Sequence, residues 1–84
     1  MSSESAKNLY QLGNQEFQNQ RYEAALKYFE QALALQAEFM EAHYNAGLCY
    51  LKMENPEQAL AQFTIILQKH PDHPLVLQQM ARVY

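Results

Sequence analysis

Hydrophobic residues recur along the chain at the spacing of an α-helix. From Tyr22 onward, apolar side chains fall at positions i, i+3, i+4 and i+7, which is one face of a helix, and the same face returns from Ala59 onward. Alternation with a period of two, which is typical of a half-buried strand, is not sustained. The pattern therefore predicts an all-α protein with helices over Ser5–Asn19, Tyr22–Gln36, Glu38–Met53, Pro56–Lys69 and His73–Arg82.

The helical pattern repeats after 34 residues, the distance from Gly13 to Gly47. Two full periods, 6–39 and 40–73, are followed by a terminal helical segment, 74–84, and we expect them to form one domain over the whole chain (1–84). Each full period holds two helical patterns, which predicts a right-handed array of helix hairpins. The shift by one period superimposes Tyr10 on Tyr44, Ala25 on Ala59, Leu26 on Leu60, Phe29 on Phe63 and Leu33 on Leu67.

Both glycines lie inside predicted helices, where a glycine costs about 1 kcal/mol relative to alanine because its backbone has the most freedom to lose. The apolar pattern continues past each of them, which is not typical of a helix C-cap. We expect them to face Ala25 and Ala59 of the following helices, so that the two helix axes of a hairpin approach closely. Phe29 and Phe63 would then fill the space beside the contact.

These features resemble the tetratricopeptide repeat, a family with a period of 34 residues. The matching stretches are LYQLGNQEF with YEAALKYFEQAL and HYNAGLCYL with PEQALAQFTIIL, and Pro71 closes the second period. The resemblance covers Ala6 to Tyr84 and implies an α-α superhelix of antiparallel hairpins. The chain departs from the family pattern at Leu9 and His43, where tryptophan is common, at Glu16, where an aromatic is usual, and at Ala37, where the first repeat lacks its proline.

The resemblance also implies a function, because this family binds peptides or partner proteins in a concave groove lined by the first helix of each repeat. Tyrosine offers such a surface a large rigid area with a polar tip, and an asparagine amide can donate to and accept from a peptide backbone. Tyr10 and Tyr44 are in phase, so we expect them side by side. The candidate partner-binding residues are Tyr10, Asn14, Phe17, Tyr44, Asn45, Leu48, Gln78 and Arg82, with Lys7, Glu41, Lys52 and Gln79 on the same faces.

One branch of the family holds the acidic C-termini of heat-shock chaperones in a clamp of asparagines, lysines and an arginine. The two clamp asparagines fall on Asn14 and Asn45, but the cationic places fall on Tyr10, Leu75 and Gln79. Without the cations a carboxylate loses charge-assisted hydrogen bonds of about 1.5–3 kcal/mol each. A chaperone C-terminal tail is therefore not an expected partner.

A structural or assembly role is the alternative to peptide binding, and both remain open. Val83 is in phase with Cys49, which we expect to face its own hairpin partner, and the final segment has no such partner. Two and a half repeats are also fewer than the ~3 usually needed for stability. The interpretation is either a piece of a longer repeat array or a homo-oligomer, with self-association through Met80, Val83 and Tyr84.

The amino-acid composition argues against some classes of partner. The net charge is −3 with scattered acidic residues and no basic stripe, so neither nucleic acid nor an anionic membrane is an expected partner. No apolar run approaches the ~20 residues that span a bilayer, and the first residues do not resemble a secretory signal. We expect a cytoplasmic protein.

Catalytic and metal chemistry have little support. Cys49 is the single cysteine, so neither an intramolecular disulfide nor a cysteine-based metal site is expected, and we expect it to be a small buried side chain. His70, Asp72 and His73 are too few for a closed metal site, and His43 is expected at the hairpin contact. We predict no catalytic residue, no metal and no cofactor, and an enzyme is the least favoured class.

Overall fold

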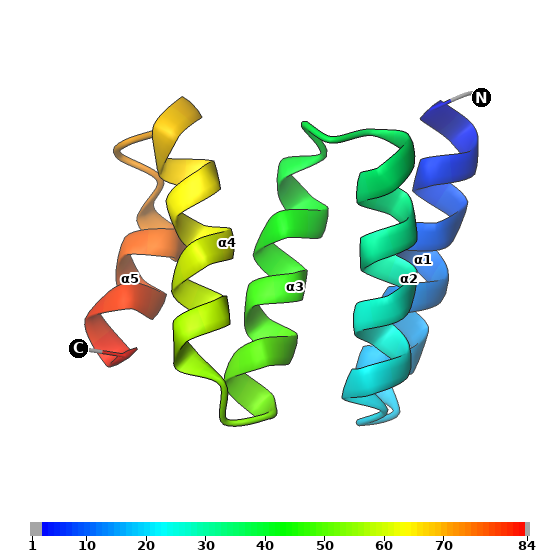
Figure 1. The fold of residues 1–84 in the computed structure, drawn as a ribbon, viewed down its shortest axis with the longest axis horizontal. Helices are drawn as coiled ribbons and strands as arrows, with labels where there is room; N and C mark the ends of the chain where they lie inside the picture. Colours follow the sequence, from blue (N-terminus) through cyan, green and yellow to red (C-terminus); the bar gives the residue numbers. More distant parts are fainter. Residues whose placement is uncertain (1–2, 84) are drawn as a thin grey trace.

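The computed structural model describes the backbone of residues 3–83 and the side chains of residues 5–83. Within that part the chain is helical and contains no strand, as the hydrophobic pattern predicts. The predicted bounds of the fourth helix and the start of the second are confirmed, and the remaining bounds differ by one or two residues. The helices are α1 (Ser3–Gln18), α2 (Tyr22–Leu35), α3 (Met40–Lys52), α4 (Pro56–Lys69) and α5 (Pro74–Val83), shown in Figure 1.

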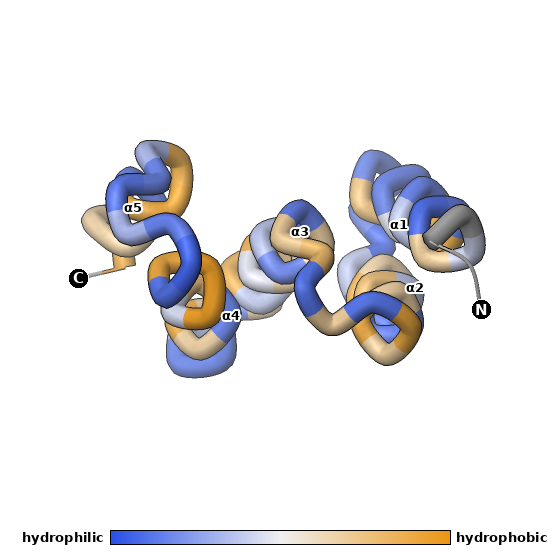
Figure 2. The backbone as a smooth tube through the Cα atoms, turned by 90° about the horizontal axis from the view of Figure 1, so that it is seen from above, coloured by the Kyte–Doolittle hydropathy of each residue, from blue (hydrophilic) through white to orange (hydrophobic). Residues whose placement is uncertain are grey.

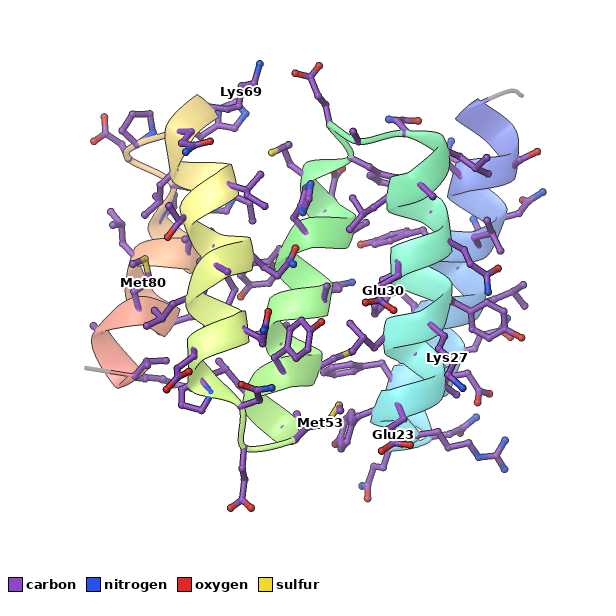
Figure 3. All side chains as sticks on the ribbon, in the orientation of Figure 1. Glu23, Lys27, Glu30, Met53, Lys69 and Met80 are labelled. Carbon is purple, nitrogen blue, oxygen red and sulfur yellow. The ribbon has the colours of Figure 1, made fainter. Side chains whose placement is uncertain are left out.

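The five helices form two rows. Seen from above, α1, α3 and α5 lie in one row and α2 and α4 in the other (Figure 2). Each helix runs antiparallel to the next, and packing joins α1 to α2, α2 to α3, α3 to α4 and α4 to α5. Charged side chains cover the outward face of α2, where Glu23, Lys27 and Glu30 are exposed (Figure 3). The result is a solenoid of helix hairpins.

A glycine and a phenylalanine ring form the central contact of each hairpin. A methyl group added at Gly13 would lie 2.6 Å from Cε1 of Phe29, and Gly47 makes the same contact with the ring of Phe63. Both rings are fully buried. The prediction that both glycines lie at the hairpin contact is confirmed, but their nearest neighbours are the phenylalanine rings rather than Ala25 and Ala59.

Both hairpins turn through the same backbone motif. Gln20 and Glu54, one period apart, adopt left-handed conformations with φ of 62° and 59°. After α1, the amide of Arg21 donates to the Glu16 carbonyl at 2.9 Å and the amide of Gln20 to that of Phe17 at 3.0 Å. The corresponding bonds after α3 measure 2.8 and 3.1 Å. This is the Schellman pattern of helix termination.

Successive repeats pack through a stripe on α3 and on α5. Cys49 is fully buried in a cluster with Ala25, Leu26 and Phe29 of the preceding hairpin. The expectation that Cys49 faces its own hairpin partner is therefore wrong, because its side of α3 packs on α2. On the equivalent stripe of α5, Val76 is buried against α4 and Met80 packs beside it.

The last helix has one uncovered face. Met80 and Val83 are in phase with Ala46 and Cys49, so they share the stripe that faces α4 rather than an outward face; both are partly exposed. The uncovered face of α5 instead carries Leu77, which is 46% exposed, and Ala81. Tyr84 lies outside the described residues.

Candidate functional site

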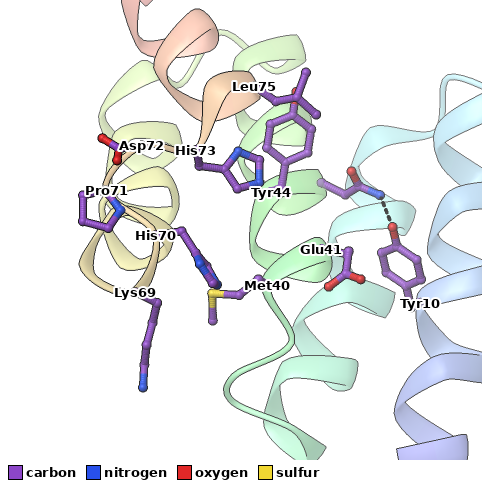
Figure 4. A pocket seen from close by; sticks show the side chains of 11 residues that line it. Tyr10, Met40, Glu41, Tyr44, Lys69, His70, Pro71, Asp72, His73 and Leu75 are labelled. Carbon is purple, nitrogen blue, oxygen red and sulfur yellow. Dashed lines mark hydrogen bonds between the residues drawn. The ribbon is translucent and has the colours of Figure 1, made fainter.

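A cavity of about 740 Å³ lies on the side of the first helices. It opens between α1, α3 and α5 and is closed at one end by the loop between α4 and α5 (Figure 4). We call it the tyrosine cavity. Its lining consists of Tyr10, Met40, Glu41, Tyr44, Asn45, Leu75 and the segment 69–73.

Two tyrosines are anchored beneath this cavity by aromatic packing. The ring of Tyr10 lies 5.7 Å from that of Phe29 and 4.8 Å from that of Phe39. The ring of Tyr44 lies 5.9 Å from that of Phe63 and stacks on His73 at 6.3 Å. The tyrosines therefore line one cavity, as expected from their phase, while each ring is fixed by its own hairpin.

Hydrogen bonds between successive first helices fix the polar tips. Asn45 donates from Nδ2 to the Tyr10 hydroxyl at 3.1 Å and to Oδ1 of Asn14 at 2.7 Å. One period later, Gln79 donates from Nε2 to the Tyr44 hydroxyl at 3.5 Å. Each hydroxyl accepts, so its own proton remains available to a ligand. Both N–H groups of Asn45 are used internally, which leaves only its carbonyl for a ligand.

A second cavity of about 560 Å³ lies further along α3 and α5. We call it the basic cavity, because Lys52 and Arg82 both line it. The hydrogen bond from Gln79 to the Tyr44 hydroxyl links the two cavities, because Gln79 lines the second cavity and Tyr44 lines the first. The remaining lining residues are Leu48, Leu51, Glu54, Pro56 and Val83.

Some of the predicted partner-binding residues line neither cavity. Phe17 packs edge-on against Tyr22 with ring centroids 5.2 Å apart and lies against the core of the first hairpin. Gln78 is exposed and is in the lining of neither cavity. The sequence prediction missed Met40, Leu75 and the loop, although Leu75 follows Glu41 by one period and could have been found that way.

His43 ties the second hairpin together. It is only 8% exposed, its Nε2 donates to the Ala37 carbonyl at 2.8 Å, and its Nδ1 lies 2.8 Å from Oε1 of Gln62. The expected role at the hairpin contact is confirmed, and it explains how a histidine replaces an apolar residue at this place.

An ion pair and burial both shift the pKa values of side chains. Lys69 approaches Glu38 to 2.7 Å, and this hydrogen bond and its charge lower the pKa of the carboxyl and raise the pKa of the ammonium. Burial raises the pKa of the Cys49 thiol to about 12. The described residues include no group of three or more side chains placed to hold a metal ion. None of the described helices is long and apolar enough to cross a membrane.

Comparison with known families agrees with this architecture. The profile of the tetratricopeptide repeat matches residues 10–74. The chain belongs to this family, whose repeats generally mediate protein–protein interactions and act as non-catalytic modules. A search of curated proteins gives no match.

Proposed function

We propose that the chain is a protein-interaction module that binds a peptide segment of a partner in the groove formed by the two cavities. The observation that carries the proposal is the tyrosine cavity, which combines exposed apolar surface with hydroxyl donors held in fixed positions. A concave apolar site with a few placed polar groups is the usual form of a binding site. Preorganised side chains also lower the entropy lost on binding.

Leu75 gives the proposal a direct test. It is 51% exposed and lines the tyrosine cavity, whereas Leu77 on the same helix is 46% exposed and lines neither cavity. Peptides selected from a random displayed library on the wild-type protein should bind Leu75→Ser at least about fivefold more weakly, because truncation of an anchor residue costs more than about 1 kcal/mol. Leu77→Ser should bind them unchanged.

Both variants should leave the fold intact, since each removes a half-exposed side chain, and circular dichroism checks this. Equal affinity for wild type and Leu75→Ser would place the bound peptide elsewhere. Failure of the library to yield any binder that competes at this groove would contradict the function itself.

Self-association is the second candidate, and the open end of the array favours it. We propose that a second copy covers Leu77 and Ala81 on the uncovered face of α5. In α3, the positions equivalent to Leu77 and Ala81 are covered by α4, and α5 lacks that cover. Sedimentation over a wide concentration range should show a rising mass for the wild type and a constant monomer mass for Leu77→Glu and Ala81→Glu. A wild type that stays monomeric throughout would contradict it.

A further inference from the structure

The groove carries opposite charges at its two ends, and we infer that it selects an extended peptide with a basic residue at one end of the bound segment, an acidic residue at the other and an apolar residue between. The inference rests on the proposed function and names the ligand class for the same site. It follows from the charges that border each cavity, from the distance between them and from the donors that lie between.

The tyrosine cavity is bordered by acidic side chains. Glu41 and Asp72 both line it and are exposed (Figure 4). Its one lysine, Lys69, is held by Glu38 at 2.7 Å, so its charge is offset locally. A basic side chain of a ligand is therefore favoured at this end.

The basic cavity has the opposite character. Lys52 and Arg82 line it and are exposed, against one carboxylate, that of Glu54. No ion pair in the described part of the chain involves either cation. An acidic side chain of the ligand is therefore favoured here, and the guanidinium of Arg82 suits a bidentate carboxylate contact.

The length of α3 sets the spacing between the two charges. Glu41 and Lys52 lie on the same helix near its two ends, which at 1.5 Å per residue separates them by about 16 Å. An extended peptide covers that distance in about five residues. A helical ligand would need about eleven.

The tyrosine hydroxyls favour the extended form. Tyr10 and Tyr44 each accept a hydrogen bond from a side-chain amide, so their protons remain available to a ligand in the groove. An extended backbone presents unpaired carbonyl groups to such donors, whereas a helix uses its carbonyls internally. The apolar residue of the peptide then lies against Leu75 and Tyr44 in the tyrosine cavity, because Tyr44 lies between Glu41 and Lys52 on α3.

Synthetic peptides test the charge pattern. The probe is a fluorescein-labelled peptide of about ten residues with one arginine and one glutamate five positions apart and a leucine between them; the control replaces both charges with glutamine. Fluorescence anisotropy should show the charged probe binding about three- to tenfold more tightly at low salt, with the difference reduced in high salt. Probes with the charges two or eight positions apart should lose most of that gain.

Variants of the protein separate the inference from the function on which it rests. Arg82→Glu and Glu41→Lys should each abolish the difference in affinity between the charged probe and the glutamine probe, while the matched control Lys27→Glu, on the outward face of α2 (Figure 3), should retain that difference. Equal binding of both probes by wild type and Arg82→Glu, with loss of both in Leu75→Ser, would overturn the charge selection and leave the groove function standing. Binding of neither probe, with no library peptide dependent on Leu75, would overturn both.

Discussion

At the scale of single residues, the contact between Gly47 and Phe63 is the most sensitive point of the second hairpin. The ring is fully buried and lies where the first carbon of any side chain would be placed. Gly47→Leu should therefore lower the free energy of unfolding by roughly 3 kcal/mol, the upper part of the range for overpacking. Gly47→Ala should lower it by only about 1 kcal/mol, because alanine recovers about 1 kcal/mol of helix propensity. Urea denaturation followed by circular dichroism measures both.

Two further variants serve as controls for this prediction. Gln31→Leu, at an exposed position in α2, should change stability by no more than about 0.5 kcal/mol. Combining Gly47→Ala with Phe63→Leu should cost less than the sum of the single changes, because the smaller side chain makes room for the methyl group. Additive effects would mean that the two residues do not share the space.

Cys49 predicts a specific dependence on pH. Burial raises the pKa of its thiol to about 12 from an ordinary value of 9.0, so the unfolded chain releases the proton first. The contribution of Cys49 to stability is therefore constant below pH 9 and declines as the pH rises from 9 to 12. Iodoacetamide at pH 8 should label the native protein far more slowly than the protein in urea. Equal labelling rates would show that the thiol is accessible in the native state.

At the scale of helices, the turns between paired helices hold removable strain. Glu54 adopts φ of 59°, and a side chain in this left-handed region costs about 1–2 kcal/mol. Glu54→Gly relieves that strain, while the greater freedom of glycine in the unfolded chain offsets about 0.4–1 kcal/mol. We expect a net gain in the free energy of unfolding of about 0.5–1 kcal/mol by urea denaturation.

Gln20→Gly, one period earlier, should give a similar gain, because Gln20 holds the same conformation. Gln31→Gly within α2 should instead lose about 1 kcal/mol, as glycine does inside a helix. A loss of stability in Glu54→Gly would mean that the glutamate side chain makes a compensating contact.

The helices could be predicted because local sequence signals define them. The turns and the site could be predicted only in part. Asn55 and Pro56 mark the start of α4, where the Asn55 side chain accepts from the Gln58 amide at 3.5 Å, and a start defined by such local signals is confirmed. The left-handed turns escaped prediction, because Gln20 and Glu54 are not the glycines that this conformation favours.

Helix phase, the angular position of a residue around its helix, predicted only part of the site. Phase correctly brought Tyr10 and Tyr44 to one cavity, but it placed Cys49 on the wrong neighbour, because it gives the angle around a helix and not which helix lies there. The internal bonds of Asn45 and the loop 69–73 in the lining depend on tertiary packing, which sequence spacing does not encode.

At the scale of the whole molecule, stability should fall toward the open end. α2 and α3 are packed on both sides, whereas α5 packs mainly on α4. Hydrogen exchange followed by mass spectrometry should therefore show the least amide protection in α5 and the greatest in α2 and α3. Uniform protection along the chain would indicate that all five helices open together.

Packing between chain neighbours also gives the molecule a mechanical property. A force applied across its two ends passes through each helix interface in turn, because the principal contacts join only adjacent elements. Elastic compliances in series add, so a small change of crossing angle at each interface accumulates into a larger bend. The molecule is in this sense elastic along its row of helices, and a ligand bound in the proposed groove would change its curvature.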